Sequence, residues 1–192
     1  MKGLLVIALI VTALSTNAQF KFGVAGGLNV SEFSDENINS SLSYYSSVVG
    51  FNTGMIFEVK FPDNIGVEMD LLYSTKGTLL DLKSRRNLTS EFSLKYIDIP
   101  IVAKVYLFKV TSIQLGVQYS YLLGANHNNQ LYETDVKDNF NSSDFSIAVG
   151  FGIDVNRLHF STRYNPGIIG ISKGGSTKIN MLTFSVGLWL KK

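Results

Sequence analysis

Large apolar residues stand at every second position in the stretch Met181-Leu182-Thr183-Phe184-Ser185-Val186-Gly187-Leu188-Trp189-Leu190. A period of two is the repeat of a β-strand, so this stretch predicts a strand with one apolar face. That face carries Leu182, Phe184, Val186, Leu188 and Leu190, and the other carries Thr183, Ser185, Gly187 and Trp189. The segment from Ile97 to Leu107 repeats the pattern, with isoleucines on one face and Asp98, Pro100, Val102, Lys104 and Tyr106 on the other.

Eight such segments follow one another along the chain, each about ten residues long, which is the length of a tilted strand that crosses a membrane. We place them near residues 20–30, 49–61, 65–75, 97–107, 112–123, 144–155, 157–165 and 181–190. Short connections alternate with long ones. The short ones lie at Pro62-Asp63-Asn64, at 109–111 and at Val155-Asn156; the long ones span 31–48, 76–93, 124–143 and 166–179. This rhythm is typical of an up-and-down barrel in an outer membrane.

The apolar faces are predicted to point outward, into lipid. An eight-stranded barrel has an interior just wide enough for side chains, and about four large apolar residues per strand would not fit there. The opposite faces carry small residues: Gly23, Gly27, Gly50, Gly54, Gly116, Gly150, Gly152 and Gly187. Aromatic residues fall at strand ends, as the girdles of a membrane barrel do; they are Tyr73, Tyr119, Tyr121, Tyr164, Phe51 and Phe145 at one rim and Phe20 and Phe61 at the other. The fold class is therefore all-β, an eight-stranded antiparallel up-and-down transmembrane β-barrel; the alternative is a soluble sandwich with ordinary core aromatics.

The first eighteen residues resemble an export signal. Met1-Lys2 is a positive start, 4–14 is an almost uninterrupted apolar run, and small or polar residues lead to Ala18. This pattern predicts a secretory signal peptide over 1–18, with cleavage near Ala18 and a barrel domain over 19–192. Eleven residues of helix rise only about 16 Å, which is too short to anchor the chain in a bilayer. The predicted location is the outer membrane of a Gram-negative bacterium.

Composition excludes several classes of function. Hydrophobic residues make up 45% of the chain and charged residues 17%, with 13 Phe and 9 Tyr, so a disordered chain is excluded. The net charge is +2 and the basic residues are scattered, which argues against binding of nucleic acid. There is no cysteine, so disulfides and thiolate chemistry are absent. We expect no cofactor and no metal.

Charged residues recur on the inward faces. The basic ones are Lys21, Lys60, Lys104, Arg157 and Arg163, and the acidic ones are Glu58, Glu68, Asp70, Asp98 and Asp154. They could form the selectivity lining of a pore or a plug of ion pairs. Eight strands leave no aqueous channel to line, which favours the plug. We expect Asp98, Glu68 and Asp70 to accept from Lys104 and Arg163, and a bulge beside Asp98 to accommodate Pro100.

Three stretches resemble an outer-membrane β-barrel family that is common in Bacteroidetes and described as PorT-like or as a porin family. The opening 20–29, Phe-Lys-Phe-Gly-Val-Ala-Gly-Gly-Leu-Asn, is similar to its first strand. Tyr96-Ile97-Asp98-Ile99-Pro100, followed by Lys104, resembles its fourth, and Arg163-Tyr164-Asn165 its seventh. The chain departs from many bacterial barrels in ending Leu190-Lys191-Lys192 instead of in an aromatic residue. The resemblance implies a membrane component of a protein-secretion system as one function.

A structural or interaction role in the membrane is the leading prediction, and a lipid-modifying enzyme is the remaining alternative. His127 and His159 are the only histidines, and His159 falls at the wrong strand end for outer-leaflet chemistry, so no enzyme is predicted. Expected partners are outer-membrane lipid and lipopolysaccharide, the barrel-assembly machinery, and an envelope or secretion partner at the outer loops. Lys83, Arg85 and Arg86 form a small basic cluster in one of those loops that could contact phosphates or simply be solvated.

Overall fold

A computed structural model describes residues 18–34, 43–82, 88–108, 110–128, 133–173, 175 and 177–191. The predicted signal peptide therefore lies outside the described residues, apart from Ala18. No helix in the described part of the chain is both long enough and apolar enough to cross a membrane.

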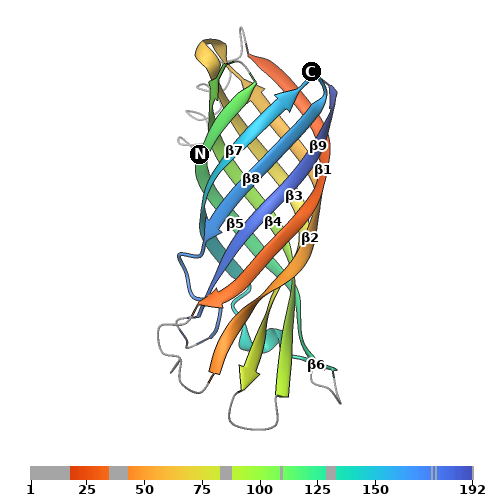
Figure 1. Ribbon diagram of the computed structural model, residues 1–192, viewed down its shortest axis with the longest axis vertical. Helices are drawn as coiled ribbons and strands as arrows, with labels where there is room; N and C mark the ends of the chain where they lie inside the picture. Colours follow the sequence, from red (N-terminus) through yellow and green to blue (C-terminus); the bar gives the residue numbers. More distant parts are fainter. Residues whose placement is uncertain are drawn as a thin grey trace, which may run out of the picture.

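The described chain is almost entirely β-structure (Figure 1). Its strands are β1 (Gln19–Ser34), β2 (Ser43–Lys60), β3 (Ile65–Leu82), β4 (Leu88–Leu107), β5 (Thr111–Asn128), β6 (Glu133–Asp135), β7 (Ser143–Val155), β8 (Leu158–Pro166) and β9 (Lys178–Lys191). Each pairs antiparallel with its neighbours in the order β4-β3-β2-β1-β9-β8-β7-β5, and a further β4–β5 pairing closes the sheet. The eight-stranded antiparallel barrel predicted from the sequence is confirmed. The short β6 pairs only with the end of β5.

Short turns gather at one end of the barrel, which we call the turn end, and long hairpins at the other, the loop end (Figure 1). The turn between β2 and β3 is a 3-10 segment, η2 (Pro62–Asn64), in which Asp63 and Asn64 adopt positive φ of 66° and 61°. Asn156, between β7 and β8, has φ 54°. Asp and Asn tolerate this left-handed conformation better than most residues, which explains how such tight reversals form here.

Several strands are longer than the sequence analysis predicted. β2 begins at Ser43, β3 runs on to Leu82 and β4 begins at Leu88, so much of the predicted long connections 31–48 and 76–93 is strand. β5 continues to Asn128. These extensions project beyond β1 and β9 at the loop end in Figure 1. They were missed because outward residues there, such as Ser47 and Lys95, are polar, so the pattern of a lipid-facing strand does not continue.

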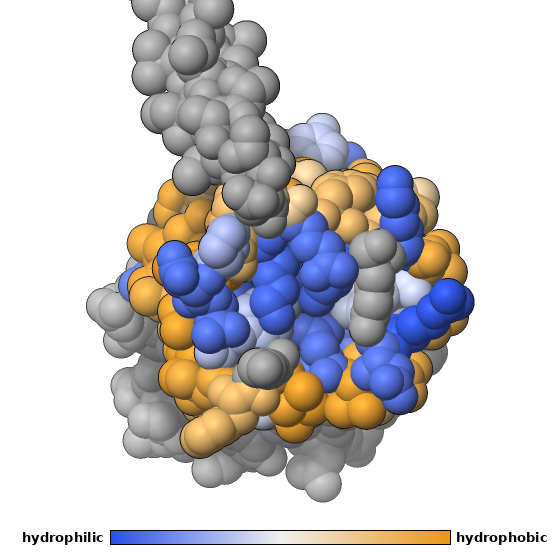
Figure 2. Space-filling model, turned by 90° about the horizontal axis from the view of Figure 1, so that it is seen from above, coloured by the Kyte–Doolittle hydropathy of each residue, from blue (hydrophilic) through white to orange (hydrophobic). Residues whose placement is uncertain are grey.

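The outward face forms an apolar belt around the barrel. Leu28, Phe51, Leu115, Phe151 and Val186 are each about half exposed, and they come from five different strands. Figure 2, which looks onto the turn end, shows hydrophilic residues in the centre and hydrophobic residues around them. The predicted aromatic residues lie on this outward face, with Phe51 against Tyr73 and Tyr119 against Phe145 at centroid distances of 5.9 and 5.1 Å.

Toward the loop end, the apolar residues move from the outward positions of the strands to the inward positions. On β9, the outward residues change from Leu182 to Asn180 and Lys178, while the inward ones change from Thr183 to the buried Met181 and Ile179. The same reversal occurs on β1 and β4, where Glu32 and Lys95 face outward beside the buried Phe33 and Leu94. Beyond the belt, the strands therefore have the apolar interior and polar exterior of a sheet in water.

Pro100 lies within the ladder, and the predicted bulge beside Asp98 is wrong. The register shift of β4 against β5 falls between Lys95 and Tyr96, and Pro100 itself stands opposite Gln118 of β5. On the β3 side the register is the same before and after Pro100, but the described pairing passes from Ile101 to Asp98. The missing amide of proline is thus accommodated by a local loss of pairing, without an inserted residue.

Candidate functional site: a filled lumen beneath an apolar cap

Ionic side chains fill the half of the lumen nearer the turn end, and we call this group the ionic cluster. Its members, all buried or half-buried, are Lys21, Glu58, Glu68, Asp70, Lys104, Asp154, His159 and Arg163. They come from six of the eight barrel strands. Because inward positions alternate with belt positions on every strand, the same period that builds the belt delivers these charges to the interior.

Lys104 lies at the centre of the ionic cluster and is fully buried. Its Nζ donates to Glu58 Oε2 at 2.8 Å and to Glu68 Oε2 at 2.7 Å. Asp154 Oδ2 lies 3.8 Å from the same nitrogen, and Lys21 Nζ approaches the other oxygen of Glu58 at 3.3 Å. A buried ammonium needs such partners, because desolvation without them is costly.

Arg163 binds two carboxylates and an amide at once. Its Nη1 donates to Asp70 Oδ2 at 2.6 Å, and its Nε donates to Gln114 Oε1 at 2.6 Å. Its Nη2 forms an ion pair with Glu68. The planar guanidinium offers several donors in fixed directions, which suits it to join carboxylates held by different strands.

Asp154 lies among aromatic side chains with hydrogen-bonding groups near the turn end. Its Oδ1 accepts from Trp189 Nε1 at 2.8 Å and lies 3.0 Å from His159 Nδ1, while its Oδ2 accepts from Tyr106 at 3.0 Å. The Tyr106 hydroxyl lies within hydrogen-bond distance of Glu58 as well, so its single proton is shared between the two carboxylates. These aromatic side chains are bulky, so they close the space between the charges as well as bonding to them.

Amides and hydroxyls fill the waist of the barrel. Asn29 Nδ2 donates to Ser74 Oγ at 2.9 Å, Asn52 Nδ2 donates to Asn29 Oδ1 at 2.8 Å, and Ser185 Oγ donates to Asn52 at 3.1 Å. The cavity beside them has a volume of about 10 Å³, which is about the room that one water molecule needs. This level of the lumen offers no space for a hydrated ion.

The sequence analysis predicted that Asp98 would pair with Lys104 or Arg163. In the structure it pairs with neither of them. It accepts from Lys76 Nζ at 2.8 Å, and the same ammonium donates to Ser120 Oγ at 3.0 Å. The reason is distance along β4: six residues separate Asp98 from Lys104, which is about 20 Å of strand. Sequence reasoning missed Lys76 because it placed 76–93 in a loop. The continued alternation of Ser74, Lys76 and Thr78 could have identified it.

Arg157 is the second correction to the predicted interior charges. The chain reverses at Asn156, and Arg157 is exposed in that turn instead of facing the lumen. Lys60 lies half-buried at the turn end of the lumen, with its Nζ 3.8 Å from the centroid of the Tyr106 ring. Lys76 and the buried Asp144 join the interior set, so the described lumen holds five basic residues and six acidic ones. The charges remain balanced to within one.

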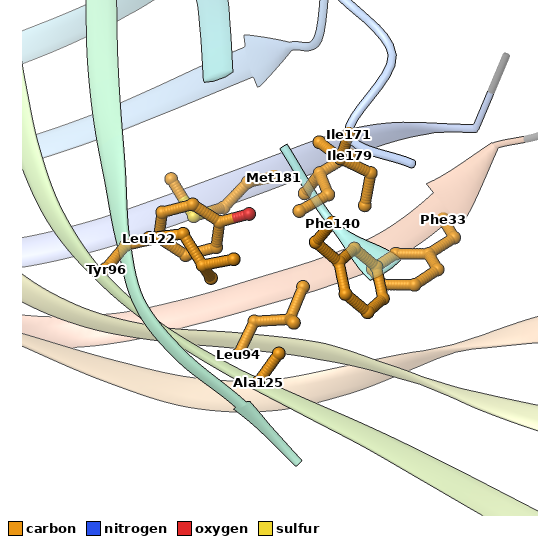
Figure 3. Close-up of a cluster of buried hydrophobic side chains, with 9 residues drawn as sticks. All are labelled: Phe33, Leu94, Tyr96, Leu122, Ala125, Phe140, Ile171, Ile179 and Met181. Carbon is orange, nitrogen blue, oxygen red and sulfur yellow. The ribbon is translucent and has the colours of Figure 1, made fainter. Parts of the chain in front are cut away.

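An apolar cap closes the lumen at the loop end. Figure 3 shows its members pointing toward one another from the wall and from two connections; they are Phe33, Leu94, Tyr96, Leu122, Ala125, Phe140, Ile171, Ile179 and Met181. Phe140 comes from the connection between β5 and β7 and Ile171 from that between β8 and β9. Asn141 N donates to Ile171 O at 2.7 Å, which binds the two connections together.

The arrangement of the histidines offers little to a hydrolase. His159 contacts Asp154 and Glu68 inside the ionic cluster, and His127 stacks on the Phe92 ring at 4.5 Å. Within the described ranges, no three His, Cys, Asp or Glu residues are arranged to hold a metal ion. The site is therefore best described as a packed lumen.

Comparisons with known proteins agree with this architecture. A family model described as an outer membrane protein beta-barrel domain matches residues 15–173. Among solved structures, neisserial surface protein A (NspA) is similar at 14% identity and a TM-score of 0.55, over 89% of this chain and 97% of that one. Ail of Yersinia pestis, in complex with the heparin analogue sucrose octasulfate, is similar at 10% identity and a TM-score of 0.52, over 90% and 99%. A search of curated proteins found no match.

The family match allows the two ends of the barrel to be assigned to the two sides of the membrane. Outer-membrane barrels have short periplasmic turns and longer extracellular loops, so the turn end faces the periplasm and the apolar cap is extracellular. The family match covers well over half of the chain. The chain belongs to the outer membrane protein beta-barrel domain family and is a small outer-membrane β-barrel.

Proposed function

We propose that this barrel is closed to solutes and acts through contacts at its extracellular end, in a structural or interaction role, without catalysis. The observation that carries the proposal is the double closure of the lumen. The ionic cluster blocks the periplasmic half, and the apolar cap blocks the extracellular mouth. A barrel with no path through it can meet other molecules only at its rims, its belt and its loops.

The extracellular end has the features of a binding platform. Its two connections are held to the wall and to each other by backbone hydrogen bonds, such as Val136 N to Ala125 O at 2.9 Å and Lys173 N to Asn139 O at 3.0 Å. Loops on a rigid scaffold are where binding usually resides. The complex of Ail with a heparin analogue supports a binding role for a barrel of this fold.

Outer-membrane lipid, lipopolysaccharide and another envelope component are the partners that we propose, with the barrel-assembly machinery acting during insertion. The basic cluster Lys83, Arg85 and Arg86 lies outside the described residues. The finer resemblance to PorT-like barrels, and the secretion role that it implies, stays a prediction because the matching family has the broader description.

Cross-linking on intact cells tests the proposed role. Lys137 and Lys173 lie at the extracellular end and supply amines for the reagent. We expect cross-links from these lysines to lipopolysaccharide or to an envelope protein. The double variant Thr134→Glu/Ser142→Glu adds two negative charges at exposed positions of this end, which repel anionic lipopolysaccharide, and should lower the lipopolysaccharide yield at least fivefold. The charge reversal Arg157→Glu, at the exposed periplasmic turn, is the matched control and should leave the yield unchanged. An equal loss in both variants, or no envelope cross-link from Lys137 or Lys173, would contradict the proposal.

A further inference from the structure

A pocket of about 230 Å³ lies at the extracellular mouth, beside the apolar cap. Three phenylalanine rings form its walls. Phe33 of β1 lies 6.2 Å from Phe92 of β4 and 6.5 Å from Phe140, measured between ring centroids. Figure 3 shows two of these rings, Phe33 and Phe140, side by side. Rings at such distances and inclined angles present edges and faces to a flat guest.

The polar lining residues of this pocket, Asn139, Ser172 and Thr177, all come from the two connections. The barrel wall supplies the rings of Phe33 and Phe92. The remaining lining residue is Val136, so no charged side chain lines the pocket among the described residues. A pocket of this kind favours a neutral guest with an apolar body and one polar group, because few, well-placed polar groups fix the orientation in an apolar site.

Two of the rings that line the pocket, Phe33 and Phe140, belong to the apolar cap. Leu94 and Leu122, members of the apolar cap, are fully buried at 0% exposure. The walls are also held in place, since Ile171 N donates to Thr177 O at 2.8 Å and Phe140 pairs with Ser172 in a β-bridge. The pocket is therefore preformed, and a molecule that enters it from outside meets the packed apolar cap.

We infer that this pocket binds a small neutral aromatic molecule that carries one hydroxyl or carbonyl group. A cavity of about 150 Å³ lined by apolar side chains already accommodates benzene. The larger volume here, about 230 Å³, suits a two-ring molecule. The inference deepens the proposed function and rests on it, because it gives the extracellular platform a ligand class.

The test uses the full mature chain in lipid nanodiscs and the probe 6-fluoro-2-naphthol, observed by fluorine NMR. We expect line broadening that saturates with protein, beyond that from empty nanodiscs, and at least tenfold weaker binding of the charged analogue 6-fluoro-2-naphthoate. Ser172→Trp fills the pocket and should weaken naphthol binding at least tenfold. Ser142→Trp is the matched control, since Ser142 is exposed on the same extracellular end and does not line the pocket.

A second variant keeps the test informative if Ser172→Trp folds poorly. Phe92→Leu retains apolar bulk but removes one ring wall, and it should weaken binding at least threefold. The unboiled variant should still migrate differently from the boiled one in SDS gels, which shows that the barrel is folded. Equal broadening with empty nanodiscs, or unchanged binding in both pocket variants, would overturn the inference. Such a failure leaves the cross-linking result intact, so it is distinguishable from a failure of the proposed function.

Discussion

Arg163 Nη1 lies 2.6 Å from Asp70 Oδ2, although three strands separate β8 from β3 in either direction around the barrel. The pair therefore crosses the full width of the lumen. A contact of this kind can form only if the interior is narrow enough for two side chains to span it. It ties opposite walls together and occupies the path that a solute would take.

Removing Arg163 should destabilise the barrel strongly. Arg163→Ala strands the carboxylates of Asp70 and Glu68 in the interior, and the loss of one partner from a buried pair costs about 3–5 kcal/mol. Lys173→Ala is the control, because Lys173 is exposed in the connection between β8 and β9 and should change stability by no more than about 0.5 kcal/mol. Urea unfolding in lipid vesicles measures both. Equal midpoints would show that the interior pair carries no stability.

A charge in the middle of the belt should be costly, and the same charge beyond the belt should not. Val186 and Asn180 both face outward on β9, but only Val186 lies within the apolar belt. Val186→Arg should cost about 2–4 kcal/mol, while Asn180→Arg should cost no more than about 1 kcal/mol. The folded fraction of each variant in vesicles, read from the difference in gel migration between unboiled and boiled protein, gives the two free energies. If Val186→Arg folds as well as wild type, the assignment of faces is wrong.

The apolar cap should depend on Ile171. This side chain is fully buried, and truncation of such a residue to alanine removes about 2–5 kcal/mol of packing. Ile169, in the same connection, is 46% exposed and serves as the control. Hydrogen exchange at the Asn141 amide, which donates to Ile171 O, reports cap opening. We expect faster exchange in Ile171→Ala and no change in Ile169→Ala; the opposite order would refute the role of Ile171.

Export should leave a defined amino terminus. Mass spectrometry of the protein from the outer-membrane fraction should find Gln19 as the first residue, because the leader pattern ends at Ala18. Recovery of the protein in the soluble periplasm, or with the leader still attached, would contradict the predicted processing.

The membrane part of the fold was predictable because one physical constraint governs it. Lipid outside and a narrow polar interior force alternation at every position, which is visible in Leu182 to Leu190 without any structure. Inward charges such as Lys104 and Arg163 follow from the same period. Their partners were less predictable, since pairing depends on the register between strands that are not neighbours. Asp98 shows this, because its partner Lys76 lies on β3 at a height that periodicity alone does not give.

The extracellular end was not predicted, for a different reason. Beyond the belt, water replaces lipid, so the outward positions of a strand need no longer be apolar. Lys95 and Asn180 look like loop residues in a search for lipid-facing strands, yet they lie on paired strands. The apolar cap also needs Phe140 and Ile171, which come from two connections far apart in the sequence. No local pattern brings those residues together.

Planar-bilayer recording of the purified wild-type barrel tests the closure of the lumen most directly. The ionic cluster, the hydrogen-bonded waist with its cavity of about 10 Å³, and the apolar cap lie in series along the lumen formed by the described residues. We predict no resolvable single-channel steps for wild-type protein whose insertion is verified by its gel shift. Stable, large single-channel currents from the same preparation would show an open aqueous lumen and would contradict the sealed barrel.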